Sequence, residues 1–88
     1  MLVPIAVKTL KDYKLLIEFS NGEKKIYDAK TDISHGIFKS LKDKNLFSLA
    51  TIARGTVTWN DDLDIAPETL YEESKLVEHA NREDYTQE

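Results

Sequence analysis

Residues 13–28 read YKLLIEFSNGEKKIYD, in which two segments of alternating apolar and polar residues flank the dipeptide Asn21-Gly22. Alternation with a period of two is typical of a strand that buries one of its faces. Asn-Gly is the strongest short signal for a hairpin, because both residues accept a positive φ. A two-residue loop there places Ile17 opposite Ile26, with this apolar pair on the core face.

A further strand is predicted before this hairpin, where Val3, Ile5 and Val7 alternate with other residues. Pro4 lacks an N–H, which favours an edge position or the beginning of the strand. A three-residue loop over residues 10–12 would pair Val7 with Leu15 and keep the apolar residues of both strands on one face. The first three strands therefore form an antiparallel meander.

After the meander, helical spacing of apolar residues predicts a short helix over about residues 35–42. Residues 47–53 and 56–60 then alternate as two strands, and Arg54-Gly55 connects them. A two-residue loop places Ile52 opposite Val57, although an arginine accepts a positive φ poorly and favours a longer loop.

The last predicted element is a helix that begins at Pro67, a residue suited to the first helical position, and fades near residue 80. The order β-β-β-α-β-β-α predicts an α+β fold with two helices and one antiparallel sheet of about five strands. Residues 1–80 form the single α+β domain, and residues 81–88 are expected to be a flexible acidic C-terminal tail.

Composition and charge limit the function classes. The chain has 88 residues and no cysteine, which excludes disulfides, thiolate metal sites and thiol nucleophiles. It has no apolar run near the roughly 20 residues of a membrane helix, so we expect a soluble cytoplasmic protein without membrane contact. Residues 1–59 carry ten basic and six acidic residues, and residues 60–88 carry two basic and ten acidic ones. This split of +4 and −8 indicates either a solvated acidic segment or a surface for a basic partner, and the overall acidity disfavours nucleic acid.

Catalytic motifs are missing from the sequence. The two histidines, His35 and His79, are expected at the surface, and three glycines cannot build a phosphate-binding loop. The spacing of Asn60, Asp62 and Asp64 imitates the start of a calcium loop, but Ile65 stands where that loop needs glycine. We therefore expect no enzyme, no cofactor and no metal, and carboxylates that bind backbone N–H groups instead.

Five residues nevertheless form a candidate surface for a partner or ligand: Trp59, Asp61, Asp62, Asp64 and Tyr71. Tryptophan is enriched in binding hot spots, but Trp59 also suits a core position beneath the last helix. If the surface binds a small molecule or a cation instead, a concave pocket should lie between Asp28, Trp59 and Asp64. The register places Asp28 on the core face at a strand end, where its carboxylate caps the turn at 30–32 or serves a site.

Three groups of residues form an ordered set over about residues 3–74. They are Tyr13-x-Leu15-x-Ile17-x-Phe19-x-Asn21-Gly22-Glu23 with Tyr27-Asp28, Gly36-Ile37-Phe38-x-x-Leu41-Lys42-Asp43 with Leu46-Phe47, and Gly55-Thr56-Val57-x-Trp59 with Asp62-Leu63-Asp64-Ile65-Ala66-Pro67-Glu68-x-Leu70-Tyr71. This set resembles a small bacterial family, domain of unknown function 2442. The resemblance implies an α+β domain that is sometimes joined to a helix-turn-helix and is suspected to be the antitoxin of a toxin–antitoxin pair. It supplies no catalytic or binding residues.

Together these observations predict a non-catalytic protein-interaction module, an antitoxin that neutralises a small basic protein partner, the toxin. The alternative is a regulatory module that binds a small molecule or metal ion. Self-association into a homo-oligomer stays open, and direct nucleic-acid binding by this domain alone is not expected.

Overall fold

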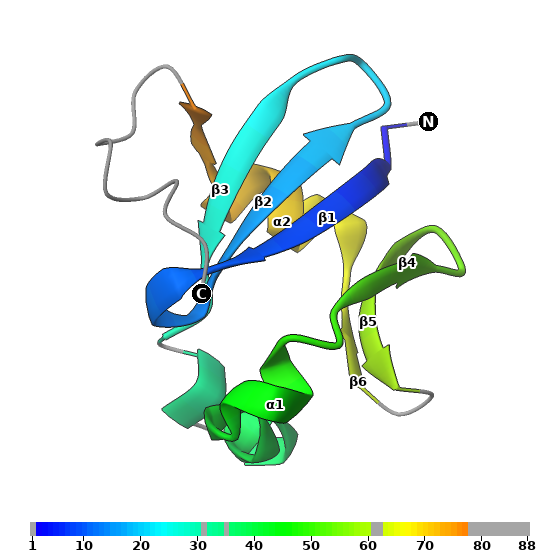
Figure 1. Ribbon diagram of the computed structural model, residues 1–88. Helices are drawn as coiled ribbons and strands as arrows, with labels where there is room; N and C mark the ends of the chain where they lie inside the picture. Colours follow the sequence, from blue (N-terminus) through cyan, green and yellow to red (C-terminus); the bar gives the residue numbers. More distant parts are fainter. Residues whose placement is uncertain (1, 31, 35, 61–62, 78–88) are drawn as a thin grey trace.

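The computed structural model describes residues 2–30, 32–34, 36–60 and 63–77, and it has an α+β fold with antiparallel strands (Figure 1). The predicted fold class is therefore confirmed. The strands form a four-stranded sheet, β1-β2-β3-β7, and a three-stranded sheet, β4-β5-β6, rather than one sheet of about five strands. The helix α2 lies behind the four-stranded sheet (Figure 1). The elements are β1 (Pro4–Leu10), η1 (Lys11–Tyr13), β2 (Lys14–Phe19), β3 (Lys24–Asp28), η2 (Asp32–Ser34), η3 (Gly36–Lys42), α1 (Lys44–Phe47), β4 (Thr51–Ala53), β5 (Thr56–Asn60), β6 (Leu63–Ile65), α2 (Pro67–Glu73) and β7 (Lys75–Leu76), where η marks a 3-10 turn.

The β2–β3 hairpin forms, but its register differs by one residue from the predicted one. Ile17 lies opposite Lys25, not opposite Ile26. The loop has three residues, because the Phe19 N–H donates to the Glu23 carbonyl over 2.8 Å. Gly22 takes a φ of +90°, the left-handed residue that a three-residue hairpin loop requires. The one-residue slip puts Lys25 and Glu23 on the face that packs against the core.

The β1–β2 pair differs from the prediction by two residues. Val7 lies opposite Ile17, and the connecting turn is Lys11–Tyr13. Tyr13 has a φ of +61°, which is strained for a bulky side chain, and its hydroxyl donates to the Lys42 carbonyl over 2.5 Å. A shift of two residues preserves the faces, so Val7 still packs against the core. A bulge between Pro4 and Ala6 leaves Ile5 exposed.

The β4–β5 hairpin has the predicted register. Ile52 lies opposite Val57, and Thr51 lies opposite Thr58. The loop has two residues despite the arginine, because Arg54 and Gly55 both take a positive φ, of 54° and 79°. Two positive φ values are the requirement of a type I′ turn.

Residues 36–65 form several short elements that the spacing of apolar residues did not predict. The predicted helix over 35–42 is the 3-10 turn η3, and α1 follows it, with the Asp43 carboxylate accepting from the Asn45 N–H over 2.9 Å. This cap makes the start of the predicted strand 47–53 helical, and only Thr51–Ala53 is extended. Leu63–Ile65 adds β6 beside β5, which completes a second sheet.

The helix α2 begins at Pro67 as predicted but ends at Glu73, well before residue 80. Ser74 is extended, and Lys75–Leu76 pairs with Lys25 and Ile26 of β3. Pairing with the open edge of β3 satisfies backbone groups that a continued helix would leave unpaired at that edge. The expected acidic tail, residues 81–88, lies outside the described residues.

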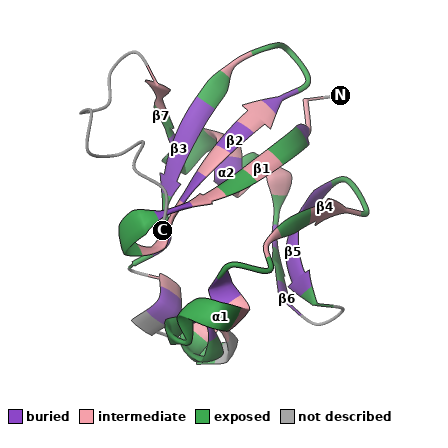
Figure 2. Ribbon diagram, in the orientation of Figure 1, coloured by how far each residue is buried: buried purple, intermediate pink, exposed green. Residues whose placement is uncertain are grey.

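A single apolar core joins the two sheets and α2. Buried residues concentrate on β2, β3 and β5 (Figure 2). The core residues are Leu15, Ile17, Phe19, Tyr27, Ala29, Ile33, Leu41, Phe47, Val57, Trp59, Leu63, Ile65 and Leu70. No helix in the described part of the chain is both long and apolar enough to cross a membrane.

Candidate functional site

Trp59, the first residue of the predicted surface, is a core residue and is only 4 % exposed. Its ring stacks on that of Phe47 at 5.9 Å between centroids and meets Phe38 edge-on at 6.5 Å. Its Nε1–H donates to the Phe47 carbonyl over 3.0 Å. The exposed-anchor interpretation of Trp59 is therefore wrong, because the ring is enclosed by aromatic neighbours. It packs against α1 and η3, and the alternative expectation, a core position for Trp59, is confirmed.

Tyr71, by contrast, is half-buried on α2 and joins the helix to the four-stranded sheet. Its ring meets Phe19 edge-on at 5.1 Å, and its hydroxyl donates to the Glu23 carboxylate. Asn21 also donates to Glu23, through its side-chain amide over 2.5 Å. The hairpin turn and α2 are thus connected by one carboxylate.

Lys25 completes this junction from the core face of β3 and is 8 % exposed. Its Nζ lies 2.5 Å from the Tyr71 carbonyl and 3.7 Å from the centroid of the Tyr71 ring. The last carbonyls of a helix lack partners within the helix and attract cations. Lys25 therefore caps the C-terminal turn of α2. The predicted register places Lys25 on the opposite face, which is why the sequence alone does not reveal this cap.

The hydrogen bonds of the junction shift two pKa values. The Tyr71 and Asn21 donors stabilise the ionised carboxylate, which lowers the pKa of Glu23 below its ordinary value of 4.5. The same contact with Glu23 raises the pKa of Tyr71 above 10.0. At neutral pH the carboxylate is ionised and the tyrosine is protonated, which is the state that forms the hydrogen bond.

A second buried phenol lies nearby on β3. The Tyr27 hydroxyl donates to the Asp32 carboxylate, and Tyr27 is 1 % exposed. Burial and this carboxylate raise the pKa of Tyr27 far above 10.0. The pair ties β3 to η2, which is a structural role.

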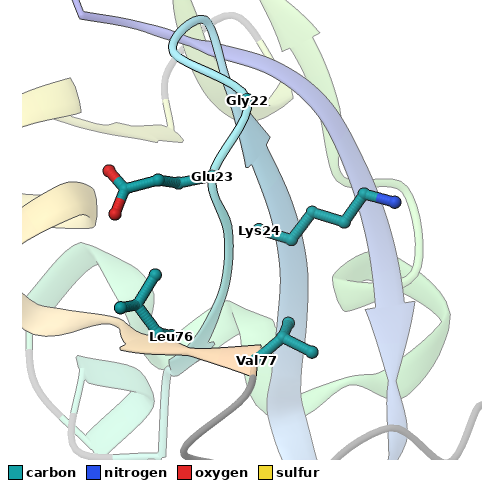
Figure 3. Close-up of a pocket in the computed structure, with 5 residues that line it drawn as sticks. All are labelled: Gly22, Glu23, Lys24, Leu76 and Val77. Carbon is teal, nitrogen blue, oxygen red and sulfur yellow. The ribbon is translucent and has the colours of Figure 1, made fainter.

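A hollow adjoins the junction where the β2–β3 turn meets β7, and we call it the turn hollow. It has a volume of about 340 Å³ and is lined by Gly22, Glu23, Lys24, Leu76 and Val77. Figure 3 shows Glu23 and Leu76 on one side of the β3 segment and Lys24 directed to the other. Leu76 and Val77 are only half-buried. The turn hollow thus offers apolar contact next to one carboxylate and one ammonium group.

The outward side of α2 is acidic. Leu70 and Ser74 are buried on its inner side, whereas Glu68, Glu72 and Glu73 are exposed. Glu68 and Glu72 are four residues apart and therefore neighbours on one face of the helix. We call these three glutamates the acidic helix face. Tyr71 connects this face to the turn hollow through its hydrogen bond with Glu23.

Of the aspartates of the predicted surface, only Asp64 lies within the described residues. Asp64 is exposed on β6, and Asp61 and Asp62 lie outside the described residues. Asp28 is exposed, so its predicted place on the core face is wrong. Its carboxylate does accept from the Lys30 N–H over 3.0 Å, which confirms the predicted cap.

Asp28, Trp59 and Asp64 line neither the turn hollow nor a second hollow on the four-stranded sheet, and Trp59 is enclosed in the core. Within the described ranges, no three His, Cys, Asp or Glu side chains are grouped so as to hold a metal ion. His35 and His79 lie outside those ranges.

Comparison with known proteins agrees with the resemblance that the motifs indicated. The model of the family described as "Protein of unknown function (DUF2442)" matches residues 4–75. The comparison with curated proteins found no match, and neither did the comparison with solved structures. The matched range includes every helix and nearly all of every strand described above, β7 being cut after its first residue. This chain therefore belongs to the DUF2442 family of proteins of unknown function.

Proposed function

We propose that this protein is a non-catalytic interaction module that binds a small basic protein, in the role of the antitoxin of a bacterial toxin–antitoxin pair. The observation that carries the proposal is the acidic helix face, Glu68, Glu72 and Glu73, exposed on the outward side of α2. It lies in the segment 60–88, whose net charge is −8. Complementary charge steers a basic partner to this side of the molecule and fixes its orientation.

The turn hollow supports the proposal because charge alone gives little affinity at a solvated surface. An apolar side chain of the partner fits against Leu76 and Val77, which are half-buried. The adjoining Glu23 carboxylate is already held by Tyr71 and Asn21, so it presents a fixed negative charge. A pre-positioned group loses less conformational entropy on binding than a mobile one.

The polar side chains of the junction already have hydrogen-bond partners within the protein, which also favours binding over catalysis. Lys25 donates to the Tyr71 carbonyl, the Tyr71 hydroxyl donates to Glu23, and Trp59 donates to a backbone carbonyl. A general acid or base must instead reach a substrate with its proton-transferring atom.

Co-expression with the product of the adjacent gene, followed by size-exclusion chromatography, tests the proposal. We expect the two proteins to co-elute, and we expect Glu68→Gln/Glu72→Gln to weaken the complex by about tenfold or more. The matched control is Asp12→Asn/Glu18→Gln, which removes the same charge elsewhere; asparagine accepts the φ of 59° at residue 12. No complex, or equal weakening by both double variants, would refute the proposal.

A further inference from the structure

The outer face of the four-stranded sheet, opposite the core, carries exposed lysines. The register aligns Ala6, Glu18 and Lys24 in one row across β1, β2 and β3. The next row aligns Lys8 and Leu16. Ala6, Lys8 and Lys24 are exposed, and Leu16 and Glu18 are half-buried. This face is separate from the acidic helix face, which lies on α2 behind the sheet (Figure 1).

A shallow hollow of about 160 Å³ marks this outer face, and we call it the sheet hollow. It is lined by Ala6, Val7, Lys8, Leu16, Glu18 and Lys24. Ala6 and Leu16 contribute apolar surface to it, and its three charged residues, Lys8, Lys24 and Glu18, have a net charge of +1. Apolar surface beside charged groups is typical of the surface of a protein interface.

The dimensions of the sheet hollow suit a helix. Neighbouring strands are about 4.8 Å apart, so Lys8 on β1 and Lys24 on β3 are about 10 Å apart across the strands, and they are offset by one row, about 7 Å, along them. A helix with its side chains is about 10–12 Å wide. A helix laid over Leu16 would therefore have one lysine on each flank, within reach of carboxylates on its surface.

We propose that the sheet hollow docks the acidic helix face of a second copy of this chain, in a head-to-tail contact. Glu72 and Glu73 of the second copy, about 100° apart around the helix, lie beside Lys8 and Lys24 on its two flanks, and the short side chain of Thr69, which lies between them around the helix, approaches Leu16. The charge complementarity of the two faces singles out this occupant. The inference goes beyond the proposed function, although a basic partner bound to the acidic helix face would compete with the second copy.

The proposed contact joins two different surfaces, so it is heterologous and can continue from copy to copy. The contact is also small, because a seven-residue helix and a hollow of about 160 Å³ provide less than the roughly 1,200 Å² of a standard interface. The self-association is therefore weak and concentration-dependent, and it is sensitive to salt, because ionic screening shortens the Debye length to about 3 Å at 1 M.

Sedimentation velocity of the full chain from low to high concentration tests this proposal. At low salt and about 1 mM protein we expect an average mass well above 10.1 kDa, which returns to that of the monomer in 1 M salt. Lys8→Glu/Lys24→Glu and Glu72→Lys/Glu73→Lys should each abolish the association. Lys39→Glu/Lys44→Glu, a matched reversal of exposed lysines on η3 and α1, should leave it unchanged.

Mixing the two charge-reversed proteins gives the decisive result. The sheet-face variant keeps a native acidic helix face, and the helix variant keeps a native sheet hollow, so we expect an equimolar mixture to associate again. If the wild-type chain is monomeric at every concentration, the proposed self-association is refuted, and the proposed function is unaffected. Association that survives either reversal, or a mixture that stays monomeric, overturns the head-to-tail geometry.

Discussion

Replacing Lys25 probes the junction that holds α2 on the sheet. Its ammonium group lies 2.5 Å from the Tyr71 carbonyl and 3.7 Å from the centre of the Tyr71 ring, and the residue is 8 % exposed. Lys25→Met keeps most of the aliphatic stem and removes the charge. Lys25→Ala removes both, so the two variants separate the contribution of the amine from that of the packing.

These contacts set the loss in the free energy of unfolding that we expect for each variant. A hydrogen bond from a charged group contributes about 1.5–3 kcal/mol, and a cation over an aromatic ring about 0.5–2 kcal/mol. Removing the amine also relieves its desolvation, which offsets part of that loss. We expect Lys25→Met to lower the free energy of unfolding by about 1–2 kcal/mol. Lys25→Ala loses about three buried methylene groups as well, at roughly 0.8 kcal/mol each, and should cost about 3–4 kcal/mol in total.

Urea unfolding followed by the fluorescence of Trp59, the single tryptophan, measures both values. Thermal unfolding gives a second measure, since 1 kcal/mol corresponds to about 4–8 °C in a domain of this size. Lys24→Met is the control, because Lys24 is an exposed neighbour and should change stability by less than about 0.5 kcal/mol. A Lys25→Met protein as stable as the wild type, or more stable, would refute the stabilising role of the amine.

Three further predictions concern the other contacts. The lowered pKa of Glu23 adds stability that is present above pH 4.5 and is lost as the pH falls through the lowered pKa. In urea unfolding, the stability that Tyr71→Phe loses relative to the wild type should therefore be largest at neutral pH and shrink below about pH 4.5. A loss that is the same at every pH would contradict this. The raised pKa of Tyr27 adds stability that is present below pH 10 and is lost as the pH rises beyond it, so Tyr27→Phe should flatten the alkaline decline seen by circular dichroism, whereas parallel curves would argue against the buried phenol as its cause. Arg54→Asn should raise the free energy of unfolding by about 0.5–1 kcal/mol, because asparagine accepts the φ of 54° more easily, and a loss of stability would show that the arginine side chain outweighs the strain.

Sequence patterns predicted the elements better than their registers. Alternation identified β1, β2, β3 and β5, because burying one face of a strand requires a period of two. The register of β4–β5 was predicted correctly, since the Arg54-Gly55 loop has two residues. The β2–β3 register was wrong by one, because Asn-Gly serves two-residue and three-residue loops alike and only the second makes Phe19 pair with Glu23.

The same slip explains what sequence reasoning missed at the candidate site. The predicted register places Lys25 on the solvent face and Glu23 directly after the turn, whereas the actual register directs both toward α2. The end of α2 was missed because apolar spacing continues past Glu73, and only the open edge of β3 makes Lys75–Leu76 a strand. In the β2–β3 hairpin and at the end of α2, pairing between strands determines the structure, and the local spacing of apolar residues does not.

Titration calorimetry with the purified partner at low and high salt measures how much the acidic helix face contributes to binding. We expect tight binding that weakens as salt screens the charges. Glu68→Gln/Glu72→Gln should weaken the affinity by a further factor of about ten or more, and Asp12→Asn/Glu18→Gln should not. Binding that is indifferent to salt and to the charges of the acidic helix face would contradict the proposed function.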